Sequence, residues 1–265
     1  MGPHRRPHQG RAERRAPAGR LLWIYGRHAV AAALANPARR WRRLAVLAGQ
    51  EAEAAALAAA AAAARHGDGE PVRGLDRAAL AALLPPGAVH QGLALEVEPL
   101  AGADLDAVLD AAPGPAVVIV LDQVTDPHNV GAVMRSAAAF GALAVIVPEH
   151  GASPVGGVLA KAASGALETV PLVRVINLAR ALDRLKDAGF WVCGLDAAAP
   201  QALAALDLGA RAALVLGSEG GGLRRLVRER CDHMARLPTG AGRTLNVSNA
   251  AAVALYELAR RRDAG

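Results

Sequence analysis

The strongest constraint on the fold is an alternation, between residues 116 and 262, of continuous apolar runs with segments of helical periodicity. Runs that are apolar at every position, and not only at alternate ones, are typical of strands buried on both faces. The pattern predicts an α/β domain over residues 116–265, with a parallel sheet covered by helices on both sides. Ligands in such domains bind at the carboxyl ends of the strands. The expected strands are 116–122, 143–147, 169–175, 190–196 and 212–217, and the clearest helix is 177–188.

A smaller α/β domain is predicted for residues 21–98. The Pro- and Gly-rich residues 99–115 predict a linker, in which 105–109 favour a helical turn. Residues 1–20 are rich in Arg, Pro, Gly and His, and they predict a disordered arm that either binds phosphates by charge or is a solvated tail. In the smaller domain we expect helices at 27–35, 51–65 and 78–84 and strands at 42–49 and 92–100.

The charge balance favours a polyanionic partner without identifying one. The chain of 265 residues has a net charge of +6, which raises the expectation of a nucleic acid. Nearly all its basic residues are arginine, and alanine is abundant as well, as in proteins from GC-rich genomes, so the arginine content alone is not evidence of guanidinium chemistry.

Several function classes are disfavoured. Cys193 and Cys231 stand alone, without the spacing of a zinc cluster or a disulfide framework. No apolar run approaches the ~20 residues of a membrane span, and the arginines of 1–20 have no apolar segment beside them, as a secretory signal requires. We therefore expect a cytoplasmic protein with no membrane segment and no metal.

The first of three candidate functional segments is 121–142. A strand ends at Asp122, a polar turn with Asp126 and Pro127 follows, and a helix begins near Asn129, which suits a capping position. Arg135 lies within that otherwise mostly apolar helix. Read alone, Arg135 is equally a functional cation, a surface residue or part of a buried ion pair.

The second segment, 213–223, is a strand that runs into a glycine-rich turn around Glu219. Glycines let the backbone approach a ligand closely, yet the turn has neither the Gly-Lys-Ser/Thr ending of a phosphate loop nor the G-x-G-x-x-G spacing. Glu219 would repel phosphate and suits a cationic ligand, unless it is merely solvated. The third segment, 236–262, is a Pro/Gly loop, a polar stretch at 244–249 and a helix that Ser248 or Asn249 could cap.

The order and spacing of these segments resemble the three motifs of the SpoU (TrmH) family of RNA ribose 2′-O-methyltransferases, in the SPOUT superfamily. The matching strings are D-x-x-x-D-P-H-N-V-G-A-x-x-R-S-A-x-x-F-G-A at 122–142, L-G-S-E-G-x-G-L at 216–223 and L-N-V-S-N-A-A-A-V-A-L-Y-E at 245–257. IYGRHAVAAAL at 24–34 and HQGLALEV at 90–97 are similar to the RNA-binding domain of bacterial members that methylate a guanosine of 23S ribosomal RNA.

The resemblance implies a SPOUT domain with a C-terminal trefoil knot, an exception to the usual avoidance of knots. It implies S-adenosylmethionine as cofactor, a homodimer whose active site is completed across the interface, and ribosomal RNA as partner. The implied reaction is methylation of a ribose 2′-hydroxyl, on a guanosine of 23S ribosomal RNA. Two alternatives stay open: a tRNA ribose methyltransferase, and a non-catalytic RNA-binding protein of the same fold.

Site residues follow from the motif positions. Thr244 stands where the family usually has serine; threonine keeps the hydroxyl and adds a methyl group. Because arginine stays protonated in proteins, we expect Arg135 to orient the ribose hydroxyl and stabilise developing negative charge, and we leave the proton acceptor open. The implied catalytic set is Asn129, Arg135, Glu219, Thr244 and Asn246, and the implied cofactor set is Gly194, Leu195, Gly217, Glu219, Gly220, Leu237, Leu245 and Asn246.

Overall fold

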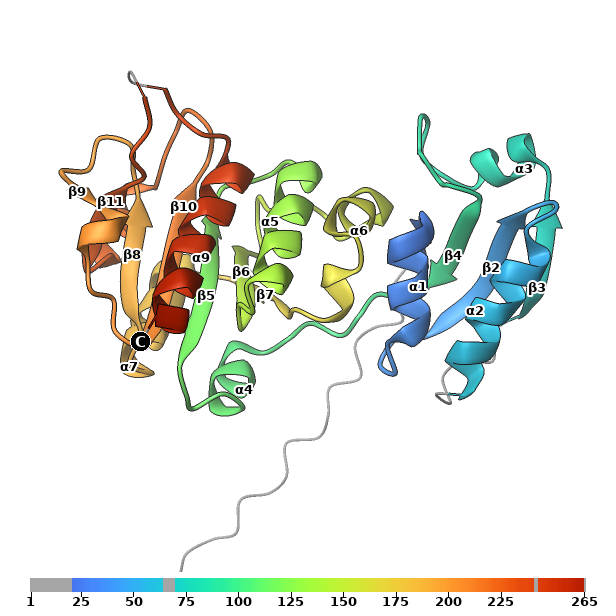
Figure 1. The fold of residues 1–265 in the computed structure, drawn as a ribbon, viewed down its shortest axis with the longest axis horizontal. Coiled ribbons are helices and arrows are strands. Elements are labelled where there is room, and N and C mark those ends of the chain that lie inside the picture. Colours follow the sequence, from blue (N-terminus) through green and yellow to red (C-terminus); the bar gives the residue numbers. More distant parts are fainter. Residues whose placement is uncertain (1–20, 64–69, 241–242, 265) are drawn as a thin grey trace, which may run out of the picture.

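The computed structural model describes residues 21–63, 70–240 and 243–264, which form two sheets with their covering helices (Figure 1). The arm expected at 1–20 lies outside these residues. The sheets belong to two domains that lie side by side, joined by a connection at the lower edge in Figure 1. We call them the small domain and the large domain.

The large domain is built on a parallel sheet of seven strands in the order β7-β6-β5-β10-β8-β11-β9. All five predicted strands are present, within one to three residues of their expected bounds. The expected strand at 169–175 begins late because Ala166–Glu168 forms a 3₁₀ turn. The bounds are β5 Ala116–Asp122, β6 Ala144–Pro148, β7 Leu172–Val175, β8 Trp191–Leu195, β9 Gln201–Ala202, β10 Arg211–Gly217 and β11 His233–Arg236.

Helices cover both faces of this sheet, as predicted. Alternate residues of β5 point to opposite sides: Ile119 packs in one apolar cluster with α5, α6 and α9, and Val120 packs in another with α4, α7 and α8. Burial on both faces explains why the strands are apolar throughout. The bounds are α4 Leu105–Asp110, α5 Pro127–Ala139, α6 Gly157–Ala163, α7 Leu178–Asp187, α8 Arg225–Arg230 and α9 Val247–Ala264.

The start of α5 corrects one expectation. The helix begins at Pro127, and its cap is Asp126, whose Oδ1 accepts a hydrogen bond from the His128 backbone N–H at 3.0 Å. Proline suits the first helical position because it lacks the N–H that would go unpaired there. Asn129, expected as the cap, lies in the first turn, and its side chain is free to bond elsewhere.

The small domain has a mixed four-stranded sheet in the order β1-β4-β2-β3. β4 is antiparallel to both β1 and β2, whereas β3 is parallel to β2. The sequence did not predict β1 or β3. The bounds are β1 Leu22–Tyr25, β2 Trp41–Leu47, β3 Glu70–Leu75 and β4 Leu93–Val97, with α1 Arg27–Ala35, α2 Glu51–Ala63 and α3 Arg77–Ala82.

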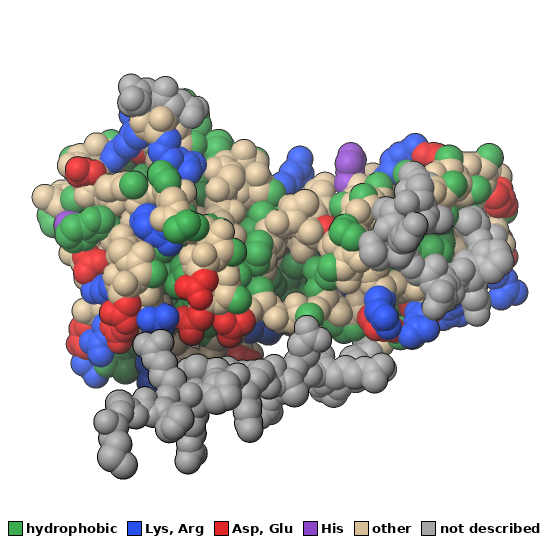
Figure 2. All heavy atoms as spheres, turned by 90° about the horizontal axis from the view of Figure 1, so that it is seen from below, with side chains coloured by type: hydrophobic (Ala, Val, Ile, Leu, Met, Phe, Trp, Pro, Cys, Tyr) green, Lys and Arg blue, Asp and Glu red, His purple; other side chains and the backbone are tan. Residues whose placement is uncertain are grey.

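Part of the range expected as a linker packs against the large domain. Ala103 forms a bridge with Val173 of β7, and Leu109 of α4 is buried with the strands of the large sheet. The helical turn predicted at 105–109 is α4. Acidic and basic side chains are intermixed on the part of the large domain visible from below (Figure 2). Exposed ion pairs of the large domain include Arg184 with Asp106 and Arg230 with Asp183.

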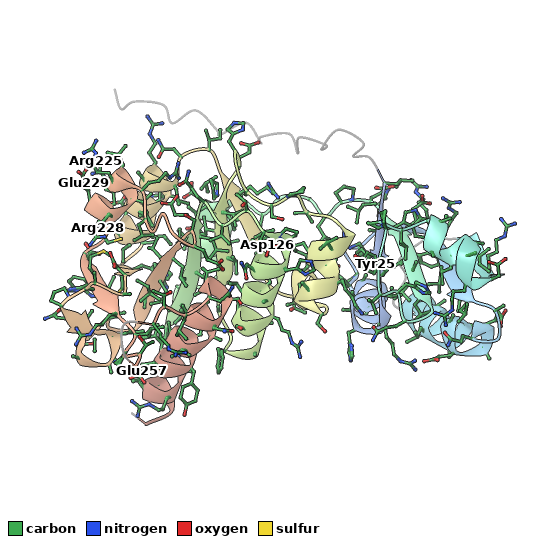
Figure 3. The ribbon with its side chains drawn as sticks, turned by 90° about the horizontal axis from the view of Figure 1, so that it is seen from above. Tyr25, Asp126, Arg225, Arg228, Glu229 and Glu257 are labelled. Atoms are coloured by element: carbon green, nitrogen blue, oxygen red, sulfur yellow. The ribbon has the colours of Figure 1, made fainter. Side chains whose placement is uncertain are left out.

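The two domains are in close contact through β1, α1 and α6. A Cβ on Gly157, at the start of α6, would lie 2.3 Å from the Trp23 carbonyl oxygen and 2.7 Å from the Tyr25 ring. Only a glycine therefore allows α6 to approach β1 so closely. Tyr25 is almost fully buried, which raises the pKa of its hydroxyl; Figure 3 shows it in the small domain, on the side that faces the large domain.

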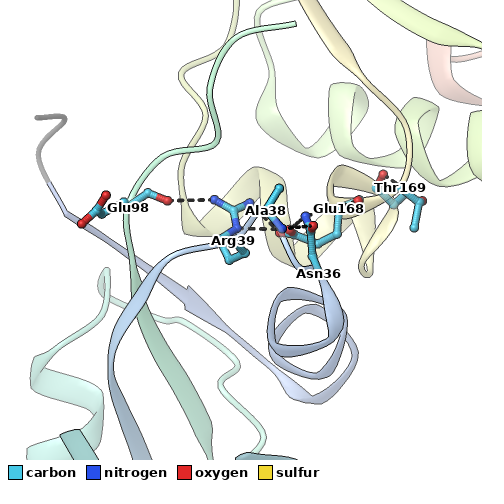
Figure 4. Close-up of polar contacts among 7 residues, drawn as sticks. Asn36, Ala38, Arg39, Glu98, Glu168 and Thr169 are labelled. Atoms are coloured by element: carbon cyan, nitrogen blue, oxygen red, sulfur yellow. Dashed lines mark hydrogen bonds and ion pairs between the residues drawn. The ribbon is translucent and has the colours of Figure 1, made fainter. Parts of the chain in front are cut away.

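A buried ion pair lies at this junction (Figure 4). Arg39 of the small domain and Glu168 of the large domain have side chains only 2% and 3% exposed. The guanidinium donates to both carboxylate oxygens, at 3.1 and 2.5 Å, and to the Glu98 carbonyl oxygen at 3.0 Å. The Asn36 amide donates to the same carboxylate at 2.8 Å. Both charges are therefore fully hydrogen-bonded, as burial requires.

Removal of one partner tests this contact. Glu168→Ala would leave the Arg39 guanidinium buried without its anion, and we expect a loss of about 3–5 kcal/mol in the free energy of unfolding. Arg42→Ala is the control, because the Arg42–Glu98 pair is exposed and should contribute only about 0–1 kcal/mol. Urea unfolding of both variants measures the difference. Equal stability of the two would contradict a structural role for the buried pair.

Candidate active site

The three candidate segments meet because β10 lies between β5 and β8 in the sheet. Gly217 at the end of β10 is paired in register with Asp122 at the end of β5, and β8 ends at Leu195 on the other side. The carboxyl ends of parallel strands share one edge. Segments far apart in sequence therefore surround a single site.

A cleft of about 710 Å³ opens at this edge. Seven of the eight residues expected to bind cofactor line it, and so does Thr244. Gly194 does not line the cleft: a Cβ there would lie 2.7 Å from the Met234 sulfur, so this glycine serves packing. The expected residues in the lining are Leu195, Gly217, Glu219, Gly220, Leu237, Leu245 and Asn246, and further lining comes from Asp196, Arg228, Thr239, Arg243 and Ala250.

The glycine turn after β10 folds back onto the strand end. A Cβ on Gly217 would lie 2.1 Å from the Gly222 carbonyl carbon, which no side chain tolerates. Gly220 and Gly222 have φ values of 86° and 63°, in the region that favours glycine. These glycines are therefore required by the close packing within the turn itself, and their expected approach to a ligand stays a prediction.

Asp122 anchors the far end of this turn. Its side chain is fully buried and accepts hydrogen bonds from the Arg224 backbone N–H at 2.8 Å and from Arg224 Nε at 2.7 Å. Because Arg224 directly follows the turn, the carboxylate ties its end to the end of β5. The glycine turn is thus held at its start by β10, which it continues, and at its end by Asp122 of β5.

Three polar side chains from the three segments meet at the rim of the cleft. Glu219 Oε1 accepts hydrogen bonds from Asn129 Nδ2 at 3.1 Å and from Asn246 Nδ2 at 2.6 Å. Asn246 Nδ2 also lies 3.1 Å from Asn129 Oδ1. Asn246 Oδ1 accepts from the Ser248 backbone N–H at 2.8 Å, so Asn246, and not Ser248 or Asn249, caps α9.

Arg135 lies apart from this cluster. Its side chain is exposed and does not line the cleft. It forms no hydrogen bond or ion pair with any residue that the structure describes. The alternative of a buried ion pair is therefore wrong, and the guanidinium is available to a ligand or to another chain.

Sequence reasoning missed Asp196 and Arg228, which form an ion pair in the cleft lining. Figure 3 shows Arg228 in the large domain. Hydrogen bonds from the Ala198 backbone N–H and from Arg228 lower the pKa of Asp196. Asp196 ends the predicted strand 190–196, so its place at the carboxyl edge was a usable signal. Arg228 comes from α8, and no local pattern indicates it.

Neither cysteine is suited to nucleophilic chemistry. Burial raises the pKa of Cys193 to about 12 and that of Cys231 to about 11, so both thiols remain protonated at neutral pH. In the described parts of the chain, no three His, Cys, Asp or Glu side chains gather as metal ligands would. No helix among the same residues has the length and apolar character needed to cross a bilayer.

Comparison with known proteins supplies the family. The model of the SpoU rRNA methylase family matches residues 116–256, and that of an RNA 2′-O ribose methyltransferase substrate-binding domain matches residues 23–102. The chain belongs to the SpoU rRNA methylase family. The match covers the first two motif segments and the third as far as residue 256. The C-terminal trefoil knot expected for this family stays a prediction.

Relatives of this SpoU protein match along most of its length. The 23S rRNA (guanosine-2′-O-)-methyltransferase RlmB of Xylella fastidiosa is 42% identical over 244 residues, which cover 91% of this chain and 96% of the relative. RlmB of Pseudomonas syringae is 47% identical over 180 residues, 66% and 72% of the two chains. The solved structure of the SpoU methyltransferase AviRb from Streptomyces viridochromogenes with AdoMet has a TM-score of 0.76 at 24% identity, covering 97% of this chain and 95% of AviRb.

Two substitutions of Asn246 separate its hydrogen bond to Glu219 from its role as the cap of α9. Asn246→Asp keeps an oxygen that caps α9 but loses the amide donor and places a second carboxylate beside Glu219. Asn246→Ala loses the cap as well, which costs about 1 kcal/mol. We expect methyl transfer to fall about tenfold or more in both variants, since each loses at least one hydrogen bond to a charged group, and the melting temperature to fall mainly in Asn246→Ala. Wild-type transfer by Asn246→Asp would show that the hydrogen bond to Glu219 has no role in the reaction.

Proposed function

We propose that this SpoU protein transfers a methyl group from S-adenosylmethionine to the ribose 2′-hydroxyl of a guanosine in 23S ribosomal RNA, in the cytoplasm. The observation that carries the proposal is the convergence of the glycine turn, the 244–246 segment and Asn129 around one cleft. The names of the RlmB relatives support the choice of RNA and nucleotide, and the substrate-binding model over 23–102 supports an RNA substrate.

The cleft suits the cofactor in shape and chemistry. The glycines at 217 and 220–222 line the cleft without side chains, so the backbone can lie close to a ligand, and the apolar side chains Leu195, Leu237 and Leu245 offer a surface for a flat base. Glu219 and Asp196 supply negative charge suited to a sulfonium cation. The bound cofactor would supply an activated methyl group, and no residue of the cleft is needed to hold a metal.

The protein must hold the hydroxyl oxygen in line with the methyl group and favour loss of its proton. In our proposal Arg135 orients the hydroxyl and the adjacent phosphate and stabilises the negative charge that develops on oxygen. The Asn129–Glu219–Asn246 cluster positions the ribose or the guanidinium. An exposed arginine with no side-chain partner among the residues that the structure describes is suited to this role, because none of their contacts must break before it binds RNA.

Arg135 does not line the cleft of its own chain, and this favours a homodimer. α5 packs against α9, with the Phe140 and Tyr256 rings 6.2 Å apart in an edge-to-face contact. On α9 the side chains of Val253 and Tyr256 are 45% and 55% exposed. We propose that two copies pair through the α5–α9 surface, so that Arg135 of one copy reaches the cleft of the other.

Nucleoside analysis tests the function. The purified protein is incubated with methyl-labelled S-adenosylmethionine, chelator and unmodified 23S ribosomal RNA or tRNA, and the RNA is digested to nucleosides. We expect label in 2′-O-methylguanosine from 23S RNA. Label in a methylated base, or in tRNA alone, would overturn the proposed substrate, and no binding of the cofactor would favour a non-catalytic RNA-binding protein.

Arg135→Ala separates catalysis from folding. Because Arg135 is exposed and has no hydrogen bond or ion pair with the described part of the chain, we expect an unchanged melting temperature and cofactor affinity, with single-turnover methylation slowed about a hundred- to thousand-fold. Arg135→Lys should rescue poorly, since an ammonium cannot reproduce the planar fork. The control is Arg180→Ala on α7, another exposed arginine with no side-chain partner among the described residues, on the opposite face of the sheet. A normal rate in Arg135→Ala would end the catalytic assignment.

Mixed dimers test whether the site is shared. Arg135→Ala and Asn246→Asp chains, each with a different tag, are co-expressed and the heterodimer is purified. If Arg135 acts on the partner's cleft, one of the two clefts regains both wild-type residues, and about half of the wild-type rate should return. A heterodimer as inactive as either parent would show that Arg135 acts within its own chain.

A further inference from the structure

We propose that a cleft in the small domain binds an unpaired base of the RNA substrate, as a second contact away from the methylated nucleotide. The inference rests on the proposed function, because it presumes an RNA substrate. The cleft, which we call the distal cleft, has a volume of about 510 Å³ and lies where β2 ends, α3 begins and the chain enters β4. Its lining includes Leu47, Gln50, Arg77, Val89, His90 and Gln91.

The lining of the distal cleft has the chemistry that a base requires. His90 Nδ1 accepts a hydrogen bond from the Gly92 backbone N–H at 3.1 Å, so in the neutral ring the proton lies on Nε2 and makes it a donor. Gln50 adds an amide, which can donate and accept. Val89 is 68% exposed and offers an apolar surface at the same cleft. Unpaired RNA bases are held by such edge hydrogen bonds combined with contact to their faces.

Arg77 supplies positive charge at the same place. Its side chain is exposed and forms no hydrogen bond or ion pair with any residue that the structure describes. A guanidinium in that state suits a phosphate or a guanine edge. The combination of an apolar surface, neutral hydrogen-bonding groups and one open cation favours a nucleotide over an apolar peptide.

The distal cleft is held in a fixed position relative to the large domain. Gln91, which has a positive φ of 53°, accepts hydrogen bonds at Oε1 from the Arg27 backbone N–H at 3.2 Å and from Lys161 Nζ of α6 at 2.5 Å. α6 in turn packs along α5, whose first turn carries Asn129. A base bound in the distal cleft would therefore set the path of the RNA toward the candidate active site.

Segments that line the two clefts lie on the same side of the molecule. The segment between α3 and β4 rises at the upper edge in Figure 1, where α5 also begins and the glycine turn leaves β10. The lower side of the large domain instead shows mixed acidic and basic side chains in its described part (Figure 2), and such a surface offers no continuous attraction to phosphates. One RNA lying along the upper side can reach both clefts.

Kinetics of the full-length protein test the proposal. The substrate is 23S ribosomal RNA from a strain that lacks the gene. We expect Arg77→Ala and Gln50→Leu each to raise the KM for RNA about tenfold, the scale of one hydrogen bond to a charged or base group, with a deficit that shrinks as RNA concentration rises. Affinity for S-adenosylmethionine should be unchanged. Arg40→Ala is the control, since Arg40 is exposed at the opposite end of the same sheet, just before β2.

A wild-type KM in both variants would overturn the proposal, as would an equal rise in Arg40→Ala, which would indicate diffuse charge. Photo-crosslinking provides a second measurement. A 4-thiouridine-substituted 23S transcript should crosslink to the peptide that contains Val89 and His90, and no crosslink there would also contradict the distal cleft. These outcomes differ from failure of the proposed function, in which the wild-type protein would not methylate the RNA at all.

Discussion

The parallel pairing of β10 with β5 on one side and β8 on the other is the constraint on which the site depends. It places Gly217 opposite Asp122, so that the buried carboxylate can hold Arg224 and fix the far end of the glycine turn. The turn must fold tightly, because a side chain at Gly217 would collide with Gly222. Only then does Glu219 reach Asn129 and Asn246, which belong to the other two segments. The hydrogen bonds of Glu219 at the cleft therefore depend on the order of the strands and on the tight glycine turn.

A second constraint joins the two domains. The Arg39–Glu168 pair is buried and fully hydrogen-bonded, and it is supported by the close approach of α6 to β1 at Gly157. A junction of this kind favours one relative orientation of the domains, because any other would leave two charges buried without partners. In the function that we propose, this rigidity lets an RNA contact in the small domain determine which ribose reaches the cleft.

The sequence predicted where most helices and strands lie along the chain, but not which strands are adjacent in the sheets. Strands such as β5 and β10 were recognisable because burial on both faces requires apolar residues throughout. β3 and β11 are short or mixed in character and are held by adjacent strands, so no local pattern indicates them. The sequence analysis took Asn129 as the cap of α5, whereas the cap is Asp126. Pro127 was the better signal for the start of this helix, because proline suits the first helical position. The order of the strands in the sheet, with β10 between β5 and β8, cannot be read from any local sequence pattern. For this reason the sequence did not indicate that Arg228 lines the cleft or that Gly194 and Arg135 do not. The resemblance supplied the reaction, which physical reasoning on each segment left open.

The reaction that we propose is methylation of one guanosine ribose in 23S ribosomal RNA. Its most direct test is a map of 2′-O-methyl sites across ribosomal RNA and tRNA from the source organism with the gene, without it, and with the gene restored. We expect one 2′-O-methylguanosine in 23S RNA to disappear on deletion and to return on restoration, while every other site is unchanged. An identical map in all three strains, or a lost site in tRNA, would contradict it.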